Sequence, residues 1–87
     1  MSNYDWFYTD DYKKDLKKLK SNFKLQKRLQ SKTKEILKNP SNAKPLRNIL
    51  KNKRRIHLGS FVLIFEIKED ENIIIFHSLK HHDEAYK

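Results

Sequence analysis

A cation and an imidazole stand on one side of a predicted strand near the middle of the chain. Arg55 and His57 alternate with the apolar Ile56 and Leu58, which is the two-residue period of a half-buried β-strand. Gly59, the only glycine of the sequence, follows them, where a tight hairpin turn requires a positive φ. A guanidinium suits a phosphate, and an imidazole can accept or donate a proton near neutral pH. The pattern therefore indicates a site that holds a phosphate and moves a proton.

The chain is strongly basic, and its charge is unevenly distributed. It has 87 residues and a net charge of +9. Residues 13–55 contain 17 Lys and Arg against two acids, Asp15 and Glu35, whereas the rest of the chain carries 3 Lys against 9 Asp and Glu. This asymmetry favours a surface that faces a polyanion, with nucleic acid as the first choice and an acidic protein as the second. The alternative is a solvated lysine-rich surface without a partner.

Length and composition predict a single domain over residues 1–87. The sequence has no cysteine, which excludes disulfides and thiolate chemistry and fits a reducing cytoplasm. The first residues do not combine a basic stretch with an apolar run, so we expect no signal peptide. The apolar runs 61–65 and 73–76 are too short to span a membrane. We therefore expect a cytoplasmic protein without a membrane anchor.

The hydrophobic pattern predicts the element order β-α-α-β-β-β. Thr9 is a suitable helix N-cap because Asp10 and Asp11 follow it in the first turn, where the helix dipole favours acids. Helical spacing predicts a buried stripe of Tyr12, Leu16, Leu19 and Phe23. We expect strands at 5–8, 54–58, 61–68 and 73–78, and helices after Thr9 and at 24–38. This order predicts an α+β fold with two N-terminal helices on a small, mainly antiparallel sheet.

The element order, the size and the run 55–65 together resemble the RelE/ParE superfamily, the small toxins of toxin–antitoxin pairs. In that pattern a Pro-Leu pair, like Pro45-Leu46 here, precedes an arginine-bearing strand and a Gly-x-aromatic turn. A basic or histidine-containing run with a final aromatic residue follows the last strand, as in residues 80–86. The resemblance covers almost the whole chain and implies a RelE-like fold.

Two positions differ from the RelE pattern. That pattern has an arginine after the turn aromatic, where this chain has Val62, and a cation where it has His57. The YafQ-like branch is similar to this chain at both positions and in its C-terminal histidine. It carries an acid where this chain has Ser60.

The resemblance implies a toxin of a type II toxin–antitoxin pair that cleaves mRNA on the ribosome and so inhibits translation. A 2′-hydroxyl would attack the adjacent phosphate and leave a 2′,3′-cyclic phosphate, without metal or cofactor. The expected catalytic residues are His57, His81 and Tyr86, and the residues expected to bind phosphate or RNA are Arg55, Lys80, Lys53 and Arg54. The adjacent His81 and His82 face opposite sides of an extended chain, so only one of them can easily enter a site. No metal site is expected, because adjacent histidines are poorly spaced for one ion and no cysteine or nearby carboxylate set completes a site. His77, inside the last strand, is predicted to be structural.

Two other functions stay open. The chain could inhibit DNA gyrase as ParE-type toxins do, or it could be an inactive relative that still binds RNA or an antitoxin. The resemblance implies a cognate antitoxin, expected to be acidic and partly disordered, as well as the ribosome and mRNA as partners. The basic helix faces would contact ribosomal RNA through its phosphates.

Overall fold

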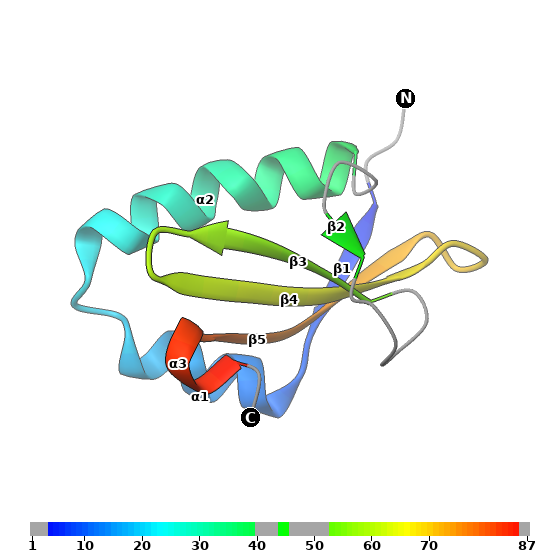
Figure 1. Ribbon diagram of the computed structural model, residues 1–87. Helices are drawn as coiled ribbons and strands as arrows, with labels where there is room; N and C mark the ends of the chain where they lie inside the picture. The colour runs from blue at the N-terminus through cyan, green and yellow to red at the C-terminus, as the bar shows by residue number, and fades with distance from the viewer. Residues whose placement is uncertain (1–3, 40–43, 46–52, 86–87) are drawn as a thin grey trace.

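The computed structural model describes residues 4–39, 44–45 and 53–85, and they form a five-stranded sheet with helices along it (Figure 1). The strand order is β1-β5-β4-β3-β2. β1 pairs in parallel with β5 and the other pairs are antiparallel. The elements are β1 (Asp5–Tyr8), α1 (Asp10–Lys18), α2 (Phe23–Lys38), β2 (Lys44–Pro45), β3 (Lys53–Leu58), β4 (Phe61–Lys68), β5 (Ile73–His81) and α3 (His82–Ala85). The α+β fold with two N-terminal helices and a mainly antiparallel sheet is confirmed.

Local capping explains where the long helices begin. The Thr9 side chain accepts a hydrogen bond from the backbone N–H of Tyr12, and Asp10 lies in the first turn of α1. The Asn22 side chain accepts one from the backbone N–H of Leu25 at the start of α2. Both bonds satisfy amide groups that a helix start leaves without a partner. The predicted N-cap at Thr9 and the break between the helices are confirmed.

One face of the sheet packs against both helices. Buried hydrophobic residues from the sheet and both helices form one core cluster. Its members are Tyr12, Leu25, Leu29, Ile36, Leu58, Leu63, Phe65, Ile67, Ile74, Phe76 and Leu79. The predicted stripe of α1 is confirmed at Tyr12, but it is wrong at Phe23, whose side chain is 77% exposed. Phe23 is the first residue of α2, so the period of α1 does not continue to it.

A β-bulge changes the side-chain alternation of β5. Ile64 pairs with Ser78 and Phe65 pairs with Phe76, so His77 is an extra residue in β5. Such a residue reverses which later side chains face the core. After the bulge β5 continues to His81, three residues beyond the predicted end. This extension moves the C-terminal histidines to the end of the sheet where the β3–β4 turn lies.

In the part of the chain that the structure describes, no helix combines the length and the apolar character needed to cross a membrane.

Candidate active site

The face of the sheet opposite the helices carries the predicted strand cations. Leu58 and Ile56 pack in or against the core, so the alternate residues of β3, Arg55 and His57, belong to the other face. His57 is exposed and Arg55 is half-buried. Lys53 follows the same alternation and shares their face. Arg54 falls on the core-side row of β3, as the alternation predicts.

Strand register connects His57 to the end of β5. His57 pairs with Val62, and Val62 pairs with Lys80. These three residues form one row across the sheet, in which the Cα atoms of His57 and Lys80 are roughly 10 Å apart. Val62 is fully buried yet lies outside the core cluster against the helices. The row therefore has an aliphatic centre between an imidazole and an ammonium group.

Beside His57, an open groove separates α2 from the end of β3. It has a volume of about 410 Å³, and its walls are Lys27, Arg28, Ser31 and Lys32 of α2 with His57, Leu58 and Gly59. Gly59 has a φ of +64°, and a Cβ atom placed there would lie 2.8 Å from Nη1 of Arg28. The glycine thus serves the turn and also makes room for a guanidinium. The groove can accept a phosphate or a carboxylate next to His57.

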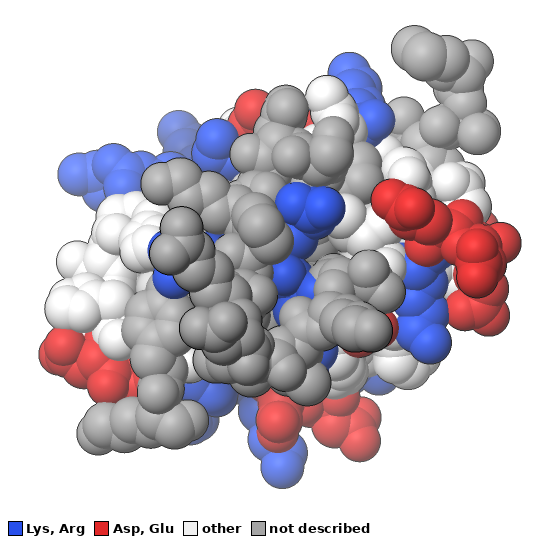
Figure 2. All heavy atoms as spheres, turned by 45° about the vertical axis from the view of Figure 1, so that its right-hand side comes forward, with Lys and Arg blue, Asp and Glu red and all other residues white. Residues whose placement is uncertain are grey.

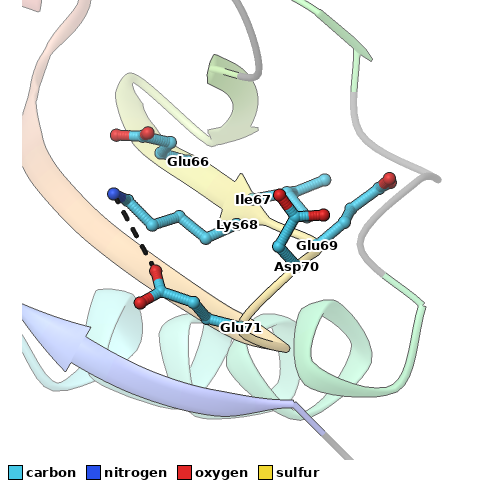
Figure 3. A pocket seen from close by; sticks show the side chains of 6 residues that line it. All are labelled: Glu66, Ile67, Lys68, Glu69, Asp70 and Glu71. Carbon is cyan, nitrogen blue, oxygen red and sulfur yellow. Dashed lines mark ion pairs between the residues drawn. The ribbon is translucent and has the colours of Figure 1, made fainter.

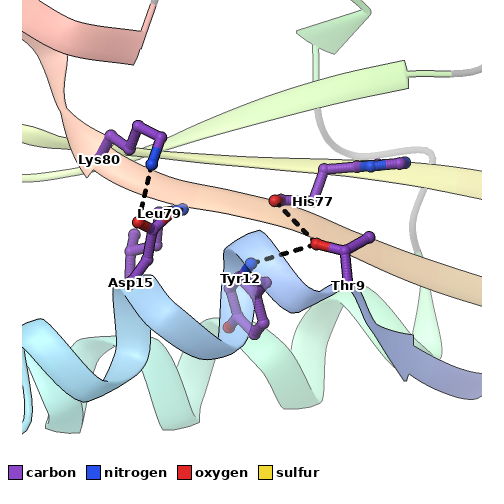
Figure 4. A network of polar contacts seen from close by, with 6 residues as sticks. All are labelled: Thr9, Tyr12, Asp15, His77, Leu79 and Lys80. Carbon is purple, nitrogen blue, oxygen red and sulfur yellow. Dashed lines mark hydrogen bonds and ion pairs between the residues drawn. The ribbon is translucent and has the colours of Figure 1, made fainter.

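Lys80 is held by a buried carboxylate that the motif analysis did not single out. Its Nζ atom donates to Oδ1 of Asp15 at 2.7 Å, and the backbone N–H of Leu79 donates to Oδ2 at 2.9 Å (Figure 4). The Asp15 side chain is 4% exposed and that of Lys80 is 34% exposed. The hydrogen bond to Asp15 raises the pKa of Lys80 above its usual value, against the opposing effect of burial. The ammonium group predicted to bind phosphate is therefore bonded to a partner within the chain.

The edge of β5 explains the position of Asp15. β1 ends at Tyr8, which pairs with Phe76, so β5 needs other partners beyond that point. Thr9 supplies two of them, because its N–H donates to the carbonyl of Phe76 and its hydroxyl to that of His77 (Figure 4). Asp15 lies one helical turn after Tyr12, on the stripe that faces the core. That spacing is the sequence signal that could have identified it.

The C-terminal histidines lie at the same end of the sheet as the β3–β4 turn. His81 pairs with Phe61, and their rings meet edge to face at 5.7 Å. Phe61 packs against the core, so His81 is in a core-side row, whereas His57 is on the opposite face. The backbone N–H of His82 donates to the carbonyl of Ser60 at 2.8 Å, which ties the start of α3 to the turn. The structure thus brings the histidines to one end of the sheet without placing His57 and His81 on one face, and Tyr86 lies outside the described residues.

Acidic side chains gather at the other end of the sheet. The β4–β5 turn forms an open pocket lined by Glu66, Ile67, Lys68, Glu69, Asp70 and Glu71 (Figure 3). Figure 2 shows the largest group of red side chains on the right, with smaller red groups at the lower left and the bottom. Because β4 runs from Phe61 to Lys68, this acidic pocket is a full strand length from the β3–β4 turn. The acidic turn and the basic groove beside His57 therefore lie at opposite ends of the sheet, while Asp83 and Glu84 of α3 lie at the end with His57.

Two further assignments concern the surroundings of the site. Nε2 of His77 lies 2.9 Å from Oε1 of Glu66, and both side chains are half-buried, as expected of a hydrogen-bonded strand histidine. The lysines and the arginine predicted to line the polar helix faces are all exposed, namely Lys13, Lys14, Lys17, Lys18, Lys20, Lys24, Lys27 and Arg28.

Comparison with known proteins agrees with this architecture. The model of the family described as the ParE toxin of the type II toxin–antitoxin system, parDE, matches residues 7–86. A relative from Methanocaldococcus jannaschii that carries the name toxin RelE4 is 41% identical over 76 residues, which cover 86% of this chain and 73% of that protein.

Solved structures share the fold at lower identity. The RelBE2 toxin–antitoxin complex of Mycobacterium tuberculosis contains a chain with a TM-score of 0.78 and 21% identity, and 97% of each chain is covered. The isolated RelE toxin of Escherichia coli has a TM-score of 0.78 at 20% identity, with 95% of this chain and 88% of that one covered.

Proposed function

Since this chain belongs to the RelE/ParE superfamily of type II toxins, we propose that it cleaves mRNA on the ribosome without a metal. The observation that supports this proposal best is the tie between His82 and Ser60. It brings two histidines of the C-terminal segment to the turn that follows His57. Groups that can transfer a proton therefore lie on both sides of the start of β4. The basic groove beside His57 offers cations for the RNA backbone.

The proposed reaction needs a base, an acid and cations. The base removes the proton of a ribose 2′-hydroxyl, and the 2′-oxygen forms a bond to the adjacent phosphorus. The bond from phosphorus to the 5′-oxygen breaks, and the acid protonates that oxygen, which leaves a 2′,3′-cyclic phosphate and a 5′-hydroxyl. Cations stabilise the added negative charge of the phosphorane.

We assign these roles to residues at the end of the sheet where the β3–β4 turn lies. His57 exchanges one proton, and the His81–His82 pair or Tyr86 exchanges the other. The side chain of His82 is 54% exposed and that of His81 is 38% exposed, so His82 is the more accessible of the pair. Arg55 binds phosphate, and Lys53 and Arg54 contribute positive charge to the same strand. Lys80 binds phosphate only if its ammonium leaves Asp15.

Mapping of RNA ends in a translating extract tests the proposal. Purified protein should create new 5′ ends within the codon in the ribosomal A site, and these ends should be absent when ribosomes are omitted. His57→Gln should lower the cleavage rate by about 10²–10⁴-fold, the usual contribution of a general acid or base. His77→Gln is the matched control, because His77 is paired with Glu66. Absence of new ends at a dose that arrests growth contradicts the proposal.

The proposed partners are the ribosome, mRNA and a cognate antitoxin. An acidic, partly disordered antitoxin segment would complement the basic groove and the helix faces, where disordered chains can cover a large surface. Co-expression with the short acidic reading frame next to the toxin gene should restore growth. Failure of every such neighbour to bind the purified toxin would contradict this assignment.

Inhibition of DNA gyrase is the second candidate, and two observations favour it. The family model that matches this chain is described as the ParE toxin of a type II toxin–antitoxin system. In addition, Val62 occupies the position where the RelE pattern has an arginine. A gyrase supercoiling assay distinguishes the two functions. Inhibition by both wild type and His57→Gln would support the gyrase candidate, and an unaffected gyrase would exclude it.

A further inference from the structure

The junction of β5 and α3 gathers two imidazoles and a carboxylate. The ring centroids of His81 and His82 are 4.4 Å apart, with 32° between the planes. Oδ2 of Asp83 lies 3.4 Å from Nδ1 of His81, and Oδ1 lies 3.2 Å from Nδ1 of His82. One ligand atom from each residue fits within 4.8 Å of the others. These three residues are called the His–His–Asp cluster below.

The backbone explains why adjacent histidines meet. In a continuing strand His81 and His82 would face opposite sides, so that only one of them could easily enter a site. The strand ends at His81 and the helix begins at His82, so the alternation stops between them. Two hydrogen bonds hold this turn, from the backbone N–H of His82 to Ser60 and from that of Asp83 to Nδ1 of His81 at 3.3 Å. The expected separation of the two rings is therefore wrong.

Each short nitrogen–oxygen separation in the cluster requires a proton or a cation between the two atoms. Nitrogen lone pairs and carboxylate oxygens repel each other at 3.2–3.4 Å unless protons or a cation lie between them. A zinc ion bound at 2.0–2.2 Å in a tetrahedron has ligand atoms about 3.3–3.6 Å apart. The two nitrogen–oxygen separations, each to a different oxygen of Asp83, are close to this range, and all three ligand atoms lie within 4.8 Å of one another. Side-chain rotations would therefore be enough to bring them around one ion.

We propose that the His–His–Asp cluster binds one divalent transition-metal ion of the Zn²⁺, Ni²⁺ or Cu²⁺ class. Imidazole nitrogen favours these ions, whereas Mg²⁺ and Ca²⁺ prefer all-oxygen sites. The side chains of His82 and Asp83 are 54% and 73% exposed, so an ion can enter from solvent and water can complete its coordination. The ion would be regulatory, because it takes no part in the proposed metal-free chemistry and occupies residues proposed for it.

Binding of the ion affects the residues proposed for proton transfer. It uses the imidazole lone pairs that accept a proton, so it converts a candidate acid–base pair into metal ligands. We therefore expect the ion to inhibit cleavage, a consequence that rests on the proposed nuclease function. The binding itself does not rest on that function and is measured without RNA.

Titration of the full, metal-free chain with Zn²⁺ alone tests the proposal. Calorimetry should give one ion per chain with a micromolar Kd. Asp83→Asn and His82→Gln should each raise the Kd at least about tenfold, whereas His57→Gln, which removes an exposed histidine of another strand, should leave it unchanged. Binding that is equal in all variants, or absent at about 1 mM Zn²⁺, would overturn the proposal.

Nuclear magnetic resonance of the unmodified protein provides a test that does not depend on folding of the variants. Ring nitrogen signals of His81 and His82 should shift on addition of Zn²⁺, while those of His57 and His77 stay in place. Shifts confined to His57 or His77 would contradict the cluster. If Zn²⁺ binds but RNA cleavage is absent in all samples, the ion site stands and the nuclease proposal fails.

Discussion

Replacement of Asp15 by alanine should lower the free energy of unfolding by about 1–4 kcal/mol. The substitution leaves the backbone N–H of Leu79 without its acceptor inside the protein, which costs about 1–3 kcal/mol. It also removes the bond to Lys80. That bond contributes at most about 1 kcal/mol, because the Lys80 side chain is 34% exposed and water screens the pair. The larger part of the loss thus comes from the strand edge and not from the ion pair.

Urea unfolding followed by circular dichroism measures this loss. A domain of 87 residues has a total stability of about 4–13 kcal/mol, so the expected change is a large fraction of it. In a thermal scan, a loss of about 3 kcal/mol corresponds to a fall in Tm of roughly 12–24 °C. Both measurements should agree if unfolding is two-state.

Three further variants separate the contributions. Asp15→Asn keeps a side-chain oxygen for Leu79 and should lose about half as much as alanine. Lys80→Met should lose at most about 1 kcal/mol, and Asp11→Ala, an exposed acid in the same helix, should also lose less than about 1 kcal/mol. If Asp15→Ala is no more destabilising than Asp11→Ala, the buried carboxylate does not anchor β5 and the reasoning is refuted.

Three other predictions concern the core and the turn. Burial raises the pKa of Tyr12, and the negative charges of Tyr8 and Asp15 raise it further. The folded state therefore retains the phenolic proton, so the free energy of unfolding should fall as the pH rises above about 10. Urea titrations at alkaline pH should show that Tyr12→Phe flattens this fall. Gly59→Ala should lower the free energy of unfolding by about 1–2 kcal/mol, because φ at this position is +64°. Addition of Arg28→Ala to the Gly59→Ala variant tests how much of this loss comes from the clash with the Arg28 side chain. Equal stability of Gly59→Ala and wild type would contradict the backbone strain. Val62→Arg should lower the stability of the protein by several kcal/mol without raising the rate of RNA cleavage, because a charge would enter a fully buried position. A stable and more active variant would show instead that this position accepts the arginine of the RelE pattern.

Local patterns were sufficient to predict most of the fold. Alternation indicated β1 and β3, a continuous apolar run indicated β4, and side-chain capping indicated the start of α1 at Thr9, because these signals depend on neighbouring residues only. The short strand β2 and helix α3 were not predicted, since each depends on a partner far along the chain. The bulge at His77 explains the underestimated length of β5: a sequence period of two cannot continue through an extra residue.

Prediction of the site was limited by the same cause. The face shared by Arg55 and His57 followed from alternation within one strand. The bond between Lys80 and Asp15 joins residues 65 positions apart, so no local pattern contains it. The convergence of His81 and His82 depends on where β5 ends, and that end lies at a helix start that the sequence did not indicate. Interactions across the sheet, and not residue types, were the missing information.

The pairing of the first strand with the last has a consequence for synthesis of the chain. Asp5 pairs with Ile73 and Tyr8 with Phe76, so the strand β1 has no partner until residues 73–76 have been made. Trp6 and Phe7, both more than half exposed even in the finished fold, are then available to chaperones or to other chains throughout translation. Long-range pairing of this kind slows folding. A growing chain therefore cannot complete its sheet, or assemble the histidine-rich end of β5, before its ribosome has made residues 73–81.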